Sequence, residues 1–149
     1  MLSAALYRLF PDQGVQTFTY GLYPHDGSWE DACTVRRSRE LNEKPIALFE
    51  TYHKGELPQS ASFLSVSADN VLVTVMKEAE DGSGDLILRL VETAGRACET
   101  QVAVHGLHRE FSLAFTPFEI KTVRIPVHSQ LEILENDLLE REEAHRQED

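Results

Sequence analysis

The chain has 149 residues, a formal net charge of −11 and a hydrophobic fraction of 42%, as expected of one folded soluble domain. No apolar run approaches the ~20 residues needed to cross a membrane, and residues 1–10 lack the apolar core of a secretory signal peptide. The acidic balance disfavours nucleic-acid binding, which needs clustered Lys and Arg. Residues 130–149 carry a net charge of −6, so we expect residues 141–149 to form a frayed acidic tail.

Alternating apolar and polar residues predict strands along most of the chain. In residues 15–23 the side chains of Phe18, Tyr20 and Leu22 fall on one side, as in a half-buried strand. Further strands are predicted at residues 46–52, 62–67, 70–77, 85–93, 98–104, 109–115, 118–125 and 130–135. Their spacing of about ten residues, with turn signals between them, predicts an all-β fold. We expect an antiparallel β-sandwich of about 8–10 strands over residues 1–140.

One segment, residues 28–41, is predicted to form a short surface helix. Ser28 is a suitable N-cap, and Asp31 stands three residues later, where a capping-box acid belongs. Acidic residues in the first turn and arginines toward the end suit the helix dipole. Asn42 is an acceptable residue at which to end the helix.

The two cysteines, Cys33 and Cys98, form neither a disulfide framework nor a zinc cage. Free thiols favour a reducing, cytoplasmic setting. Whether these two residues pair depends on their geometry, which the sequence does not give.

No common catalytic motif occurs in the chain: there is no nucleophile elbow, P-loop, dinucleotide fingerprint or H-E-x-x-H zinc motif. His105 and His108 would point to opposite faces of a strand, so no metal site is predicted. Glu80 and Asp81 lie in a Gly-rich turn, where acids usually stabilise the turn itself. The residue chemistry alone therefore indicates a β-rich domain without a visible catalytic centre.

A series of short motifs resembles family 38 glycoside hydrolases, the α-mannosidases. Residues 18–29, FTYGLYPHDGSW, resemble the F-x-Y-x-L-Y-P-H-x-G-x-W segment of that family. Further pieces follow in a compatible order: ELNEKP at 40–45, GELP at 55–58 with SFL at 62–64, NV at 70–71 with KEAEDG at 77–82, LILRL at 86–90, PFEIKT at 117–122 and NDLLE at 136–140. Each piece is weak alone, but together they cover most of residues 10–140.

The resemblance implies that the chain is the C-terminal β domain of an α-mannosidase. In that family the zinc ion, its His and Asp ligands and the Asp nucleophile belong to an N-terminal catalytic domain. No position here matches those motifs, so no catalytic or metal-binding residue is assigned to this chain. The expected partner is the catalytic domain with its zinc cofactor, which the β domain would support while contributing to the cleft for mannosides.

Four residues are candidates for contact with a mannoside. Arg89 lies in an otherwise apolar strand, so its charge must be paired or reach an edge. The expected pairing partner is Glu80, Asp81 or Glu119. His25 and Trp29 place a polar ring and an aromatic ring on one loop, where both could contact the face of a sugar. Trp29 could instead pack the helix onto the sheet. The candidates are Arg89, His25, Trp29 and Asp81.

Two other classes of function remain open. The chain could be an independent carbohydrate-binding module, which requires an exposed aromatic platform. It could also be a purely structural interaction domain, with an apolar docking face left bare. In that case we expect the isolated chain to form a homodimer through this face.

Overall fold

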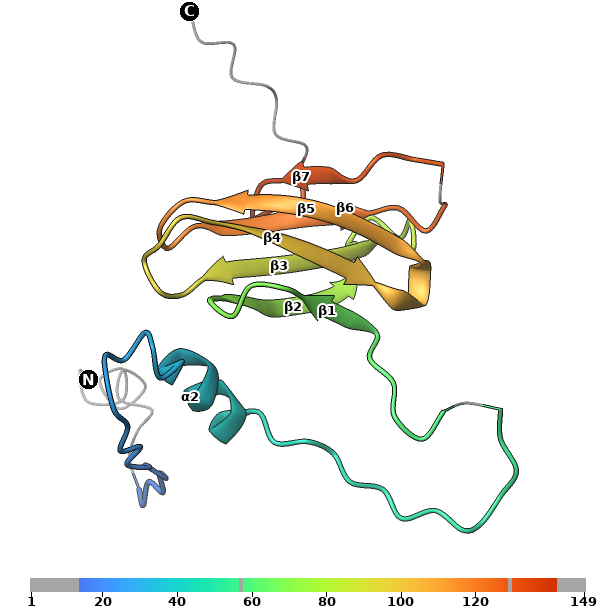
Figure 1. The fold of residues 1–149 in the computed structure, drawn as a ribbon. Helices are drawn as coiled ribbons and strands as arrows, with labels where there is room; N and C mark the ends of the chain where they lie inside the picture. The colour runs from blue at the N-terminus through green and yellow to red at the C-terminus, as the bar shows by residue number, and fades with distance from the viewer. Residues whose placement is uncertain (1–13, 57, 129, 142–149) are drawn as a thin grey trace, which may run out of the picture.

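The computed structural model describes residues 14–56, 58–128 and 130–141, and within them seven strands form two antiparallel sheets (Figure 1). Sheet A has the order β1–β4–β5 and sheet B the order β2–β3–β6–β7. The strands are β1 (Leu64–Val66), β2 (Val71–Glu78), β3 (Leu86–Glu92), β4 (Cys98–Val104), β5 (Arg109–Phe115), β6 (Ile120–Ile125) and β7 (Leu134–Asn136). The expected all-β sandwich is confirmed, with seven strands in the described residues where 8–10 were expected.

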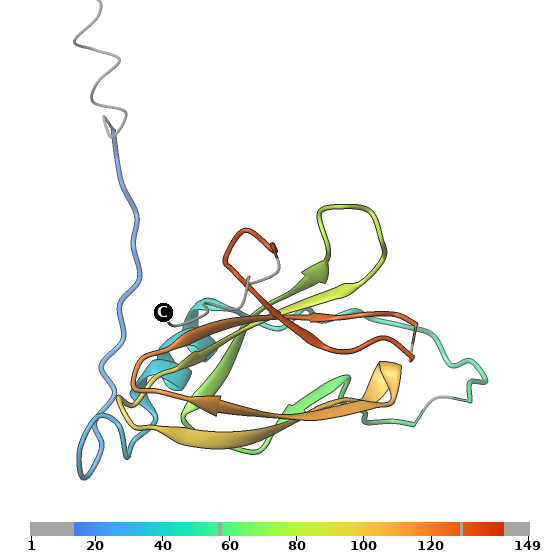
Figure 2. The ribbon, with the colours of Figure 1, turned by 90° about the horizontal axis from the view of Figure 1, so that it is seen from above.

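The core lies between the two sheets. Alternate residues of each strand point inward, as the period of a strand requires. From sheet B, Leu88, Leu90 and Val123 are fully buried, and from sheet A they meet Val102 and Phe115. Figure 2 shows the sheets as two layers, with the β2–β3 turn and the last residues of the described chain on the outer side of sheet B.

One acidic side chain of β3, Glu92, is also buried, with 1% of its surface exposed. Its carboxylate accepts hydrogen bonds from Asn70 Nδ2 at 2.8 Å and from the backbone N–H groups of Ala94, Gly95 and Phe118 at 2.7–2.8 Å. Burial opposes the charge, but these hydrogen bonds hold the pKa of Glu92 below its ordinary value. The carboxylate therefore joins the turn after β3 to the turn before β6.

The helix α2 (Thr34–Asn42) is shorter than the predicted segment 28–41. Ser28 and Asp31 form the expected reciprocal contacts, with the Asp31 N–H 3.2 Å from Ser28 Oγ. These contacts stabilise irregular turns and not the first turn of a helix. Cys33 adopts a left-handed conformation with φ of 51°, and regular helix begins only at Thr34. The predicted end at Asn42 is confirmed.

Two predicted strands, residues 15–23 and 46–52, are wrong for the structure as described. Both segments are extended but pair with no strand within the described residues. Their apolar side chains are exposed, including Leu22 at 90% and Ile46 at 89%. An alternating pattern forms a strand only where the segment has a neighbouring strand to pair with and an apolar surface to cover. Within the described residues these two segments have neither. Residues 44–56 and 58–62 run as an arc away from the sandwich (Figure 1).

Candidate functional site

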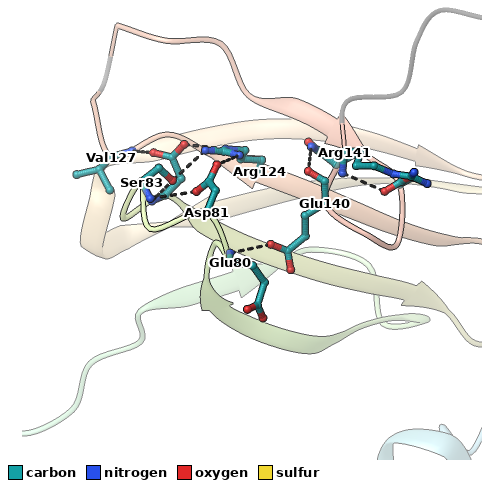
Figure 3. A network of polar contacts seen from close by, with 10 residues as sticks. Glu80, Asp81, Ser83, Arg124, Val127, Glu140 and Arg141 are labelled. Atoms are coloured by element: carbon teal, nitrogen blue, oxygen red, sulfur yellow. Dashed lines mark hydrogen bonds and ion pairs between the residues drawn. The ribbon is translucent and has the colours of Figure 1, made fainter.

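A polar network lies where the β2–β3 turn meets β6 and the last turn of the described chain (Figure 3). At its centre Arg124 of β6 uses all three guanidinium nitrogens. Its Nε donates to Asp85 Oδ2 at 2.7 Å, its Nη1 lies 2.8 Å from Asp81 Oδ2, and its Nη2 donates to Ser83 Oγ at 2.9 Å. Asp85 also accepts a hydrogen bond from the N–H of Val127 at 3.2 Å. The network fixes the conformation of the β2–β3 turn.

Asp81, a predicted substrate contact, is part of this network and not a free carboxylate. Hydrogen bonds from Ser83, and then the Arg124 guanidinium, lower the pKa of Asp81 to about 2. Gly82 and Gly84 both have positive φ, at 73° and 81°, which lets the turn fold back so that Asp81 and Asp85 reach the same arginine. Such a carboxylate stays ionised near neutral pH and is poorly suited to donate a proton.

The second half of the network joins the same turn to residues 136–141. Glu140 Oε1 lies 2.6 Å from Lys77 Nζ, and Glu140 Oε2 accepts a hydrogen bond from the N–H of Glu80 at 3.0 Å. Asn136 Nδ2 donates to the carbonyl of Glu140 at 2.8 Å, and Arg141 N donates to Asp137 Oδ1 at 3.0 Å. The last described turn is thereby held against the hairpin.

Arg89 lies on the outer face of sheet B, directly opposite Thr122 of β6. Its Nε donates to Thr122 Oγ1 at 3.3 Å and its Nη2 to the carbonyl of Leu138 at 3.0 Å. The expected ion pair is wrong: within the described residues Arg89 forms no salt bridge. The three acids named as partners pair with other cations, Glu80 with Lys77, Asp81 with Arg124 and Glu119 with Lys121.

His25 and Trp29 both precede α2 in the chain, and Trp29 lies near the end of the sandwich where β2 begins and β3 ends. The His25 ring stands 5.6 Å from that of Tyr23, and its Nδ1 lies 3.4 Å from the carbonyl of Asp26. Trp29 lines a hollow with residues that precede β2 and follow β3, such as Asn70 and Arg96. Asp81 follows the far end of β2 and Arg89 lies midway along β3, so the structure does not bring the four predicted residues together.

The described residues offer no metal site, since no three His, Cys, Asp or Glu side chains among them gather around one point. His105 instead lies 3.0 Å through its Nε2 from Ser65 Oγ. Cys33 and Cys98 are both free. Within the described ranges, no helix combines the length and hydrophobicity needed to cross a membrane.

The chain is similar to proteins named α-mannosidases. It is 33% identical to α-mannosidase G of Dictyostelium discoideum over 142 aligned positions, which cover 76% of this chain and 12% of that protein. It is 36% identical to α-mannosidase 2C1 of Homo sapiens and of Mus musculus, over 56% of this chain and 8% of each relative. The chain thus spans 8–12% of these relatives and contains a domain related to α-mannosidases. No family model and no solved structure matches it.

Proposed function

We propose that the chain is a non-catalytic C-terminal β domain of a family 38 α-mannosidase. In this role it packs on a zinc-dependent catalytic domain, supports it and contributes to the edge of its mannoside cleft. The β-sandwich and the similarity to a small part of each relative support this assignment. In this proposal the zinc belongs to the catalytic domain, as the resemblance to family 38 implies.

The observation that carries the proposal is the exposure of two apolar segments. Phe18 and Leu22 in the first, and Ile46 and Leu48 in the second, are 80–90% exposed. Folded chains rarely leave such a series of large apolar side chains in water unless another surface covers it. Both segments are extended and lack strand partners in the described structure, so their backbone groups are also free to pair with another domain.

The test is a reconstitution experiment. The full chain is mixed with a fragment of α-mannosidase G that lacks the region matching this chain. We expect a stable complex in gel filtration and a gain in zinc-dependent hydrolysis of an aryl α-mannoside over the fragment alone. Replacing Ile46 and Leu48 by Ser should weaken the complex. Replacing Val127 by Ser is the matched control, because this half-exposed side chain lies outside both segments.

Three results would contradict the proposal. Failure to bind the fragment, together with a concentration-dependent homodimer, favours the purely structural interaction domain. Failure to bind the fragment, together with saturable binding of mannosides, favours an independent carbohydrate-binding module. Hydrolysis of the aryl mannoside by this chain alone, retained through purification, would show that the chain is itself catalytic.

A further inference from the structure

The extended segment of residues 46–52 carries large apolar side chains on both of its faces. Successive side chains of an extended chain point to opposite sides, so Ile46 and Leu48 lie on one face and Phe49 on the other. These three side chains are 86–105% exposed. A segment that lies flat on a surface needs only one apolar face. Apolar side chains on both faces are typical of a strand in a sheet that is covered on both sides.

The other exposed segment, residues 15–23, has a different pattern. Its large apolar side chains, Phe18, Tyr20 and Leu22, share one face, and Thr17 and Thr19 lie on the other. That pattern requires cover on one face alone. The two segments therefore need different surroundings, and the inference concerns residues 46–52.

The backbone of this segment is free to pair. Among the described residues, no backbone N–H or carbonyl of residues 46–50 takes part in a backbone hydrogen bond. Pro45 stands directly before the segment, at a position where a strand tolerates proline. Glu50 is the single charged residue from 46 to 52. An uncharged-to-weakly-charged, apolar stretch of strand length with no proline inside it is prone to pair with another strand.

The partner strand is not supplied by the sandwich of the same chain, because the arc of residues 44–56 and 58–62 leads away from both sheets (Figure 1). The chain spans 8–12% of the α-mannosidases that it resembles, so most of such a protein lies outside it. We propose that residues 46–52 add as a strand to an open sheet edge in the remainder of an α-mannosidase, where both faces of the strand are covered. This inference rests on the proposed function and specifies how the contact forms, through main-chain hydrogen bonds along one side of the strand.

Proline substitutions test the main-chain pairing, with the full chain and the same α-mannosidase G fragment. The N–H groups of a strand alternate between its two edges, so those of Ala47 and Thr51 point one way and that of Glu50 the other. Proline removes the N–H group and is tolerated where that group faces solvent. We expect Ala47→Pro and Thr51→Pro to act alike and Glu50→Pro to act oppositely in calorimetric titrations.

The variants that lose a paired N–H should bind about tenfold or more weakly, because the acceptor opposite is left without its partner. The variants that lose a solvent-facing N–H should bind within about threefold of the parent chain. Ala61→Pro is the matched control, since Ala61 lies in the same exposed arc and outside the segment. Amide hydrogen exchange in the complex should protect the same alternate residues whose replacement by proline weakens binding.

Charged substitutions test whether both faces are covered. Leu48→Lys and Phe49→Lys place a cation on opposite faces of the segment. Each should weaken binding about tenfold or more, because each charge would be buried without a partner. Gln59→Lys, in the exposed arc, is the control. A loss in only one of the two variants would show that the segment lies on a surface by one face, and would overturn the inference.

The outcomes separate this inference from the proposed function. Binding of the fragment by the parent chain, with equal effects of the three proline variants, would overturn strand addition and leave the docking role intact. Absence of binding by the parent chain would overturn both. Self-association of the chain alone, with the same alternation among the proline variants, would assign the strand to a second copy and also overturn the inference.

Discussion

Glu140 Oε1 lies 2.6 Å from Lys77 Nζ and so joins the last described turn of the chain to strand β2. The same carboxylate accepts the N–H of Glu80, a residue 60 positions earlier in the sequence. Hydrogen bonds from Lys77 and Glu80 lower the pKa of Glu140, which keeps it ionised at neutral pH. One side chain therefore holds the C-terminal turn and the β2–β3 turn together.

Replacing Glu140 should loosen this connection in two steps. Glu140→Gln keeps an oxygen that can accept the Glu80 N–H but loses the charge opposite Lys77, whereas Glu140→Ala loses both. We expect the Glu80 amide to exchange faster in Glu140→Gln than in the parent chain, and fastest in Glu140→Ala, in hydrogen-exchange NMR. Glu132→Gln, an exposed acid close by in the sequence, is the control. Equal exchange in all four proteins would contradict this role.

The hairpin turn should lose stability in acid. Because the pKa of Asp81 is lowered from 3.8 to about 2, its ionised form stabilises the fold above pH 3.8. This contribution should disappear as the pH falls from 3.8 toward about 2, where Asp81 becomes protonated in the folded chain. Titration of the Asp81 carboxyl carbon by NMR should give the low midpoint. A midpoint at the ordinary value, or identical acid unfolding of Asp81→Asn and the parent chain, would refute this.

The strands whose bounds were predicted correctly are those in which the alternating apolar side chains fill the core. Residues 98–104 and 109–115 have the predicted bounds, since their alternate side chains fill the core. The strand predicted at 118–125 begins at Ile120, because Phe118 has a positive φ of 59° and remains in the turn. For residues 46–52 the pattern was misleading, because alternation carries no information about whether a partner strand is present.

The candidate site was less predictable than the fold. Asp81 and Arg89 were candidate contacts from the sequence, but the sequence did not indicate that Arg124 would bind Asp81 or that Leu138 would accept from Arg89. These contacts join residues 43 and 49 positions apart and depend on strand order and register. Glu92 was not singled out, because a glutamate at the end of a strand usually reaches solvent.

Two glycines with similar backbones should respond differently to substitution. Gly95 and Gly82 have φ of 66° and 73°, so alanine at either should cost about 1–2 kcal/mol for its left-handed conformation. At Gly95 the new Cβ would also lie 2.6 Å from Cζ of Phe118, whereas at Gly82 it meets no atom within 4 Å. Urea unfolding should therefore show a larger loss for Gly95→Ala. Gly55→Ala, with open space and no positive φ, is the control.

Adding Phe118→Ala to Gly95→Ala separates the two effects. The double variant should recover the part due to the clash and keep the backbone cost. Equal losses for Gly95→Ala and Gly82→Ala would show that the Phe118 ring moves aside freely.

Glu92→Gln should be among the more damaging single substitutions. The amide group would turn its own N–H donors toward the N–H groups that now donate to the carboxylate, and these would be left buried and unpaired. We expect a loss of about 2 kcal/mol or more in the free energy of unfolding. Glu78→Gln, an exposed acid on β2, serves as the control. A change below about 0.5 kcal/mol would mean that the turns do not need the carboxylate.

The attachment of α2 has a practical consequence. Among the hydrogen bonds of the described residues, the one from Arg36 to the carbonyl of Asp69 alone joins residues 14–56 and 58–61 to the residues that follow them. Every strand of both sheets lies after residue 61. A protease that cuts in the long connecting stretch should release a leading peptide and leave a trimmed body, beginning near Ser62, that still unfolds as a cooperative unit.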